Sequence, residues 1–267
     1  MTTCTLAVPG ARITYDVTGS GPVLLLIPGG AADSTMFAAI GPLLAEDHTV
    51  VTYDPRGISR SPLDGEPGDD TLREHADDVH RLLAEVGSGP ADVFANSGGA
   101  ITMLEYVVRH HGQVRTVVLH EPPVTRYLGP AVLDGPDIPA IYREHGVGAA
   151  IAAFSEMGGF DISPPADPTP EELAQMKVME GNFAYFFGHL MAAIGAYDPD
   201  LDALRAVSTR LVVGVGEKAA GLPAHEAGLG LAADLGLTAE PFPGDHGGFL
   251  AEPAAFAVRL NEVLKGR

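Results

Sequence analysis

The hydrophobic residues of this chain are grouped in short runs that alternate with segments of helical periodicity. The run Val23–Ile27 is entirely aliphatic, the pattern of a strand buried on both faces of a parallel sheet. A Pro9-Gly10 turn between the first two runs predicts an antiparallel hairpin at the sheet edge. The predicted strands are Thr5–Val8, Arg12–Val17, Val23–Ile27, Thr49–Tyr53, Ala91–Phe94, Val114–Leu119, Leu211–Val215 and Thr238–Phe242.

Helices are predicted between these strands, where apolar residues recur at helical spacing. Strands that alternate with helices imply right-handed crossovers and a parallel sheet. The sequence therefore predicts an α/β fold with a mostly parallel sheet flanked by helices. The predicted helices are Met36–Leu44 (capped by Asp33 or Ser34), one that opens at Thr71, Ala100–Arg109, His225–Leu235 and Ala254–Leu264.

The alternation stops after Pro123. Residues 124–206 carry helical patterns with Pro/Gly-rich joints and no clear strand. One helix is predicted to begin at Thr169, because Pro170 and Glu172 complete a capping box with a proline at the first helical position. We therefore expect an α/β core of residues 1–123 and 207–267, with residues 124–206 inserted after the sixth strand as a helical cap.

Composition narrows the class of protein. The chain has 267 residues and a formal net charge of −19, which argues against nucleic acid or an anionic membrane as partner, since both bind basic surfaces. Cys4 is the only cysteine, so no internal disulfide can form. We find neither a signal peptide nor an apolar run of membrane-spanning length. We expect a cytoplasmic protein.

One predicted strand ends in a serine, and a helical segment follows it directly. In Ala95-Asn96-Ser97-Gly98-Gly99 the residues two positions either side of the serine are small. This strand–serine–helix order is the context of the G-x-S-x-G nucleophile elbow, with Ala95 in place of the first glycine. The sequence predicts Ser97 as a nucleophile, and the alternative interpretation is an ordinary N-cap serine.

A serine nucleophile needs a base, usually an oriented imidazole. Among the ten histidines, His246 alone lies in a Gly-rich loop after the last predicted strand. That loop lies at the carboxyl edge of the sheet, where ligands bind in open α/β sheets. We predict His246 as the base. The chain shows no histidine–carboxylate spacing typical of a metal site, and we expect neither metal nor cofactor.

The third group must be a carboxylate that orients the imidazole. Glu121 and Glu217 both follow predicted strands at the correct edge. Two prolines after Glu121 restrict the backbone there, whereas Lys218 beside Glu217 suggests a solvated pair. We favour Glu121 and keep Glu217 as the alternative. Asp245 is adjacent to His246 and poorly placed to reach back to it.

An acyl-transfer site also needs two backbone N–H groups that bind the developing oxyanion. One is expected from Gly98, the residue after the nucleophile. The other is expected from the loop after Val23–Ile27, where Gly30 is the first choice and Ala31 the second.

With these residues assembled, the chain resembles α/β-hydrolase-fold enzymes along its whole length. The resemblance rests on Pro28-Gly29-Gly30, the loop Asp54–Ser61, the serine and histidine motifs above, and the order serine, acid, histidine. Two positions depart from the pattern: Pro28 replaces the usual His of the oxyanion loop, and Ile58 replaces the second His-like position of the strand-four loop.

Within this fold, His120-Glu121-Pro122-Pro123 is similar to a bacterial subgroup and to zearalenone-lactonase-like enzymes, which carry the triad Glu after strand six. The resemblance implies a triad of Ser97, His246 and Glu121. It also separates the chain from dehalogenases and epoxide hydrolases, which use an Asp nucleophile. Cofactor-free haloperoxidases usually have Met after the serine and a nearby Trp, whereas this chain has Gly98 and no Trp.

The insertion carries large apolar side chains that could line an adaptable pocket above Ser97. The alternative is that they are the insertion's own packing. The wider set is Met157, Phe160, Met176, Met179, Phe183, Phe186, Phe187, Met191 and Tyr197, and the predicted substrate contacts are Ala31, Met157, Phe183, Phe187 and Met191.

Three functions are compatible with these residues. The first is a serine hydrolase that cleaves a small hydrophobic ester or lactone through an acyl-enzyme. The second is a polyketide-type cyclase or C–C bond enzyme on the same fold, and the third is a small-molecule binding protein. A homodimer is compatible with the sequence.

Overall fold

The computed structural model describes residues 1–67, 71–87, 89–110, 112–159 and 167–266. Its centre is an eight-stranded sheet in the order β1-β2-β4-β3-β5-β6-β7-β8. β2 pairs antiparallel with β1 and β4, and the other neighbouring pairs are parallel. The strands are β1 (Thr2–Val8), β2 (Ala11–Gly19), β3 (Val23–Ile27), β4 (Thr49–Tyr53), β5 (Ala91–Asn96), β6 (Val114–His120), β7 (Arg210–Gly216) and β8 (Glu240–Phe242).

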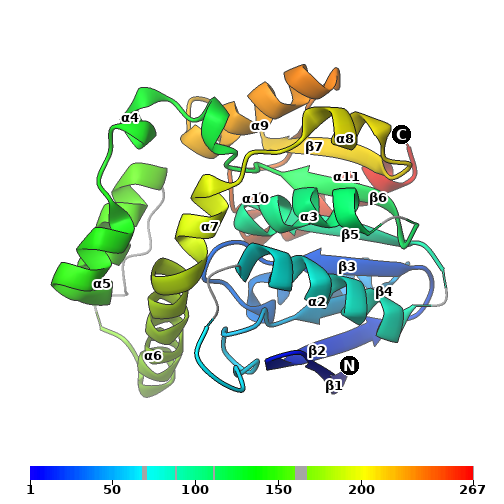
Figure 1. The fold of residues 1–267 in the computed structure, drawn as a ribbon. Coiled ribbons are helices and arrows are strands. Elements are labelled where there is room, and N and C mark those ends of the chain that lie inside the picture. Colours follow the sequence, from blue (N-terminus) through cyan, green and yellow to red (C-terminus); the bar gives the residue numbers. More distant parts are fainter. Residues whose placement is uncertain (68–70, 88, 111, 160–166, 267) are drawn as a thin grey trace.

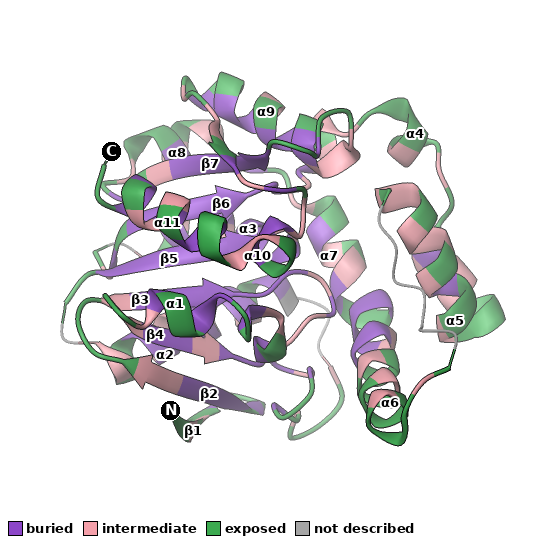
Figure 2. Ribbon diagram, turned by 180° about the vertical axis from the view of Figure 1, so that it is seen from behind, coloured by how far each residue is buried: buried purple, intermediate pink, exposed green. Residues whose placement is uncertain are grey.

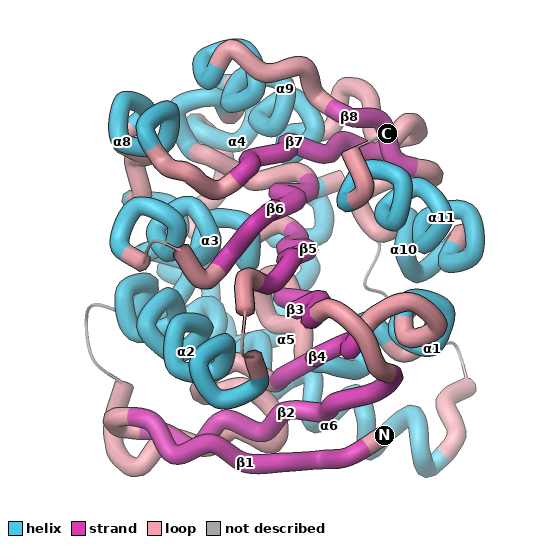
Figure 3. Tube along the Cα trace, turned by 90° about the vertical axis from the view of Figure 1, so that its right-hand side faces the viewer, coloured by secondary structure: helices cyan, strands magenta, loops and turns pink. Residues whose placement is uncertain are grey.

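Helices cover both faces of this sheet, which confirms the predicted fold class. Figures 1 and 3 show α2, α3 and α8 on one face and α1, α10 and α11 on the other. The helical elements are η1 (Ser34–Phe37), α1 (Gly41–Leu44), α2 (Thr71–Val86), α3 (Gly98–Arg109), η2 (Thr125–Tyr127), α4 (Pro130–Leu133), α5 (Ile138–Gly158), α6 (Pro170–Tyr185), the π-helical turn η3 (Phe186–Leu190), α7 (Met191–Ala196), α8 (Leu201–Ala206), α9 (Pro223–Leu235), α10 (Gly248–Ala251) and α11 (Pro253–Leu264).

The aliphatic runs are strands because both of their faces are buried. Successive side chains of a strand point to opposite faces, so Leu25 and Val93 join one hydrophobic cluster while Leu24 and Phe94 join the other. Figure 2 shows β5 buried along its length, its neighbours β3 and β6 mostly buried, and the helices exposed on their outer sides. The sheet therefore holds the ends of β5 and β6 in a rigid frame.

Some predicted elements differ in their bounds from those observed. The first strand begins at Thr2 instead of Thr5. The helix expected over Met36–Leu44 is a 3₁₀ turn capped by Asp33 followed by the separate short helix α1, because Pro42 starts a new helical turn. The last strand begins at Glu240 instead of Thr238. The residues before it close helix α9, where the Leu237 amide bonds back to the Ala232 carbonyl around left-handed Gly236.

The described parts of the insertion, residues 124–159 and 167–206, contain helices, turns and irregular segments but no strand. The predicted capping box at Thr169 and Glu172 is present. Figure 1 shows α4 to α7 beside the α/β core at one end of the strands, whereas α8 lies with α3 and α9 in the layer over the sheet. Buried residues of the insertion, such as Phe183 and Ile194, belong to the same hydrophobic cluster as one sheet face, so the insertion is anchored to the core.

Candidate active site

Ser97 lies in a strained turn between β5 and α3. Its backbone has φ 54° and ψ −123°, and its side chain makes no capping hydrogen bond to the helix. Close contacts require glycine after the serine and in the facing loop after β3: a Cβ on Gly99 would lie 2.4 Å from the Pro28 carbonyl oxygen, and one on Gly29 would lie 2.7 Å from the Ser97 Cβ. A strained serine that does not cap its helix has the geometry of a nucleophile elbow and not that of an N-cap serine.

Glu121 and His246 meet at the same edge of the sheet. Glu121 follows β6 with φ +48° and is fully buried. Its Oε2 lies 2.6 Å from His246 Nδ1, and its Oε1 accepts the Gly216 N–H at 2.8 Å. The carboxylate contacts the imidazole at Nδ1, and His246 and Ser97 both line one cavity.

The electrostatics of Glu121 favour an ionised carboxylate. Burial raises the pKa of this carboxyl, but the hydrogen bond from His246, attraction from His246 and the hydrogen bond from the Gly216 amide outweigh burial, so its net pKa is below the ordinary value. At neutral pH Glu121 is therefore an anion that can stabilise a positively charged imidazole.

Glu217, the alternative acid, does not contact the His246 ring. Glu217 is exposed, and its amide donates to the Phe242 carbonyl at the next strand. Lys218 pairs with Glu252 at 2.6 Å. Asp245 accepts the Gly247 amide at 2.9 Å within its own loop. The structure thus brings Glu121, and neither Glu217 nor Asp245, to the His246 ring.

The two predicted oxyanion donors are neighbours. A Cβ on Gly98 would lie 3.2 Å from the Gly30 nitrogen. In the described part of the chain, the amides of Gly30 and Gly98 donate to no protein acceptor. Gly30 has φ +55°, a conformation that favours glycine. Ala31 is 6% exposed and packs in the core cluster.

The loop after β4 holds the oxyanion loop in place. Asp54, which is 1% exposed, accepts the Ser34 N–H at 3.1 Å and receives the Arg60 guanidinium. Arg56 in the same loop binds Asp78 of α2 through two hydrogen bonds of 2.7 and 2.9 Å. The segment Asp54–Ser61 therefore acts structurally, by tying β4 to the loops around it.

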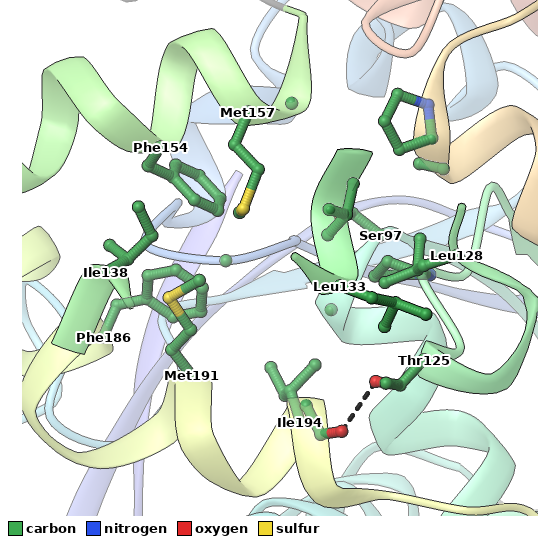
Figure 4. Close-up of a pocket in the computed structure, with 18 of the residues that line it drawn as sticks. Ser97, Thr125, Leu128, Leu133, Ile138, Phe154, Met157, Phe186, Met191 and Ile194 are labelled. Atoms are coloured by element: carbon green, nitrogen blue, oxygen red, sulfur yellow. Dashed lines mark hydrogen bonds between the residues drawn. The ribbon is translucent and has the colours of Figure 1, made fainter. Parts of the chain in front are cut away.

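A cavity of about 370 Å³ lies above Ser97, between the strand ends and the insertion. Figure 4 shows its apolar walls, which come from the segments after β6, from α5 and from the η3–α7 region. Side chains on these walls include Leu128, Ile138, Phe154, Met157, Phe186, Met191 and Ile194. Most of the described residues that line it are apolar, and its carboxylates are already engaged: Asp137 accepts the Ala140 amide and Glu121 contacts His246, so the cavity suits an uncharged apolar ligand.

The predicted pocket residues divide into two groups. Met157 and Met191 line the cavity, whereas Ala31, Phe183 and Phe187 are not among the described residues that do. Phe183 and Phe187 instead pack against Phe154, with ring centroids 6.3 and 5.6 Å from its ring. The helical pattern alone does not separate the two faces of this segment, because a π-helical turn changes its phase.

The other large apolar residues of the insertion also have different outcomes. Phe186, which belonged only to the wider set, lines the cavity, and Phe160 of that set lies outside the described residues. The walls formed by Leu128, Ile138, Phe154 and Ile194 were not predicted, because nothing in their local sequence distinguishes a cavity wall from ordinary packing.

Other kinds of site find no support in the part of the chain that the structure describes. It contains no cluster of three or more His, Cys, Asp or Glu residues that could hold a metal ion. None of its helices combines the length and apolar character needed to cross a bilayer.

Comparisons with known proteins identify the family to which this chain belongs. Residues 22–138 match the family model described as the alpha/beta hydrolase fold. A Bacillus subtilis protein described as the uncharacterized hydrolase YraK is 33% identical over 266 residues, which cover 98% of this chain and 95% of that protein. The chain therefore belongs to the α/β-hydrolase family.

Solved structures agree on the fold. The esterase RhEst1 from Rhodococcus sp. ECU1013 superposes with a TM-score of 0.75 at 23% identity, covering 99% of both chains. The enol-lactonase from Burkholderia xenovorans LB400 gives 0.73 at 21% identity, covering 98% of this chain and all (100%) of that one.

Proposed function

We propose that this protein is a serine hydrolase that cleaves an uncharged, hydrophobic carboxylic ester or lactone through an acyl-enzyme. The single observation that carries the proposal is the 2.6 Å contact between Glu121 and His246 beside the cavity into which the strained Ser97 turn opens. Membership of the α/β-hydrolase family supports the same class of reaction. Two proteins of this fold are described as an esterase and an enol-lactonase, which matches the two kinds of substrate proposed here.

The residues have these roles in the proposed reaction. Ser97 Oγ attacks the substrate carbonyl while His246 Nε2 accepts the hydroxyl proton. The Glu121 carboxylate holds the imidazole through Nδ1 and stabilises its positive charge. The amides of Gly30 and Gly98 bind the carbonyl oxygen as it becomes negative, and His246 returns the proton to the departing alcohol oxygen.

Deacylation repeats these reaction steps with water as the attacking group in place of the serine hydroxyl. His246 accepts a proton from the water molecule that attacks the acyl-enzyme, and Ser97 leaves with that proton. In a lactone the departing alcohol stays attached to the acyl group, so the product is a hydroxy acid. Residues 124–206 form the proposed cap: their apolar side chains exclude water from the site and bind the hydrophobic part of the substrate.

The test combines turnover with covalent labelling. We expect the protein to hydrolyse members of a panel of nitrophenyl esters and lactones and to react with a fluorophosphonate probe. Ser97→Ala removes the nucleophile and should lower turnover by at least about 10³-fold and abolish labelling. Ser20→Ala, in an exposed turn, is the matched control and should behave as the wild type. Undiminished turnover by Ser97→Ala contradicts the proposal.

A further inference from the structure

Two side chains of the insertion lie close to Gly30 and Gly98, the glycines whose amides are the proposed oxyanion donors. The Phe186 Cζ lies 3.8 Å from the position that a Cβ on Gly30 would take, and the Ile194 Cδ1 lies 3.0 Å from that of a Cβ on Gly98. Both residues line the cavity and are nearly buried, with exposures of 4% and 7%. Figure 4 shows both around the same cavity as Ser97. Each donor therefore has one hydrophobic side chain directly beside it.

A π-helical turn places these two side chains on one face of the helix. In a regular α-helix, eight residues advance about 80° beyond two full turns, so Phe186 and Ile194 would point in different directions. In η3 the Met191 amide bonds to the Phe186 carbonyl, five residues earlier, so the turn holds one extra residue. The effective advance from Phe186 to Ile194 is then about seven residues, within about 20° of two full turns.

Neighbouring rings hold Phe186 in position. Its ring packs at 66° to Phe154, with centroids 5.6 Å apart, and lies 5.5 Å from Phe187. Its backbone belongs to the continuous helical segment from α6 to α7. The ring therefore has little freedom to turn away from Gly30 when a ligand enters.

A carbonyl whose oxygen sits between the Gly30 and Gly98 amides must place its neighbouring acyl carbon next to these side chains. We propose that Phe186 and Ile194 determine acyl specificity: they admit substrates whose carbon beside the carbonyl is CH₃ or CH₂ and exclude those in which it is quaternary, as in a pivaloyl group. The remainder of the cavity takes an extended apolar group. This inference rests on the proposed function, because it uses the oxyanion position assigned there.

The experiment compares kcat/KM for 4-nitrophenyl acetate, propionate, isobutyrate and pivalate. The wild type should discriminate strongly against pivalate. Phe186→Ala and Ile194→Ala should each raise the pivalate-to-acetate ratio of kcat/KM by about tenfold or more, the scale expected when a packed hydrophobic wall is removed. Phe186→Leu and Ile194→Val serve as milder variants where truncation prevents folding, and they should raise the ratio in the same direction.

Phe256→Leu is the matched control for Phe186→Leu. Phe256 is 0% exposed and lies in α11, in the hydrophobic cluster on the other face of the sheet, and it is not among the described residues that line the cavity. Its substitution should leave the ratio as in the wild type. A wild type that accepts pivalate as readily as acetate, or folded Phe186 and Ile194 variants with an unchanged ratio, would overturn the inference.

A second measurement separates this inference from the proposed function. If the wild type hydrolyses no ester, the proposed function fails, and the inference is then judged by binding. Calorimetry with 4-nitroacetanilide and 4-nitropivalanilide, amides used as non-reacting probes on Ser97→Ala protein, should show weaker binding of the pivaloyl compound. Phe186→Ala added to that protein should reduce the difference. Equal binding of both amides, or binding of neither, overturns the inference.

Discussion

The Glu121 carboxylate lies 2.6 Å from the His246 imidazole, although 125 residues separate them in the chain. Strand β7 makes this contact possible. The Gly214 carbonyl accepts the Glu121 amide at 2.9 Å, and the Gly216 amide donates to the second carboxylate oxygen at 2.8 Å. The acid is thus held by backbone from the strand that lies between its own strand and the one before His246.

Glu121→Gln should lower kcat/KM by about 10²- to 10⁴-fold, because a neutral amide cannot stabilise the imidazolium or keep its tautomer. The fall should appear mainly in kcat, with folding intact, since the two side chains have similar shapes. Glu217→Gln is the matched control at the exposed alternative acid and should keep wild-type kinetics. Steady-state kinetics with one nitrophenyl ester decides between them, and a large loss in Glu217→Gln alone would reverse the assignment of the acid.

Gly29→Ala should lower kcat by about 10²-fold or more, the scale of losing one oxyanion donor. Its Cβ would lie 2.7 Å from the Ser97 Cβ and 2.8 Å from the Asn96 carbonyl oxygen, so the oxyanion loop has to move away from the nucleophile. Gly148→Ala is the control, because a Cβ on that residue of α5 meets no atom within 4 Å. Activity of folded protein, checked by circular dichroism, distinguishes the two. A Gly29→Ala enzyme with full kcat would refute the close approach of the two loops.

Asn96 and His120 form a buried pair beneath the site, one residue before Ser97 and Glu121 respectively. The Asn96 Oδ1 and His120 Nδ1 atoms are 2.8 Å apart, and burial lowers the pKa of His120 to about 3, so its ring is neutral at pH 7. Asn96→Ala leaves the ring nitrogen without its partner and should reduce the free energy of unfolding by about 1–3 kcal/mol. Urea unfolding measures this loss.

The double variant Asn96→Leu/His120→Phe tests the same pair by removing both polar partners, which should restore stability instead of reducing it. Replacing both polar partners with apolar residues removes the unpaired group, so stability should recover towards that of the wild type. A double variant less stable than Asn96→Ala would show that packing around His120, and not the hydrogen bond, is the dominant contribution.

His75 should make stability depend on pH. Burial, aided by the positive charge of Arg56, lowers the pKa of this side chain to about 3. Below the ordinary histidine pKa of about 6.5, the unfolded chain binds a proton that the folded chain does not, so the free energy of unfolding falls as pH falls, by up to about 1.4 kcal/mol per pH unit for this residue. His120 adds a dependence of the same sign.

Urea unfolding of the wild type and His75→Leu between pH 6.5 and 5 tests this prediction. The variant should lose stability less steeply as the pH is lowered. His145→Leu, at an exposed histidine of α5, is the control for the loss of one imidazole. Equal slopes in the wild type and His75→Leu would contradict the prediction.

Much of this protein could be determined from the sequence because its signals are local. Buried aliphatic runs such as Val23–Ile27 define strands within a residue or two, and the elbow around Ser97 is recognisable because its small residues are required by the turn itself. The choice between Glu121 and Glu217 could not be made in the same way, since both follow strands at the same edge. The contact of Glu121 with His246, its left-handed backbone and its bond to β7 favour Glu121, and all of them depend on the assembled sheet.

The cavity wall was decided only by the tertiary structure. The sequence predicted that the insertion would bring aromatic and methionine side chains to the site, but Phe183 and Phe187 pack inwards while Phe186 and Ile194 face the cavity. A single π-helical turn changes which face each residue occupies, and regular periodicity cannot reveal it. Strands and the nucleophile elbow can be predicted because short stretches of sequence determine them. The phase of a helix and the partner of a carboxylate depend instead on contacts between distant parts of the chain.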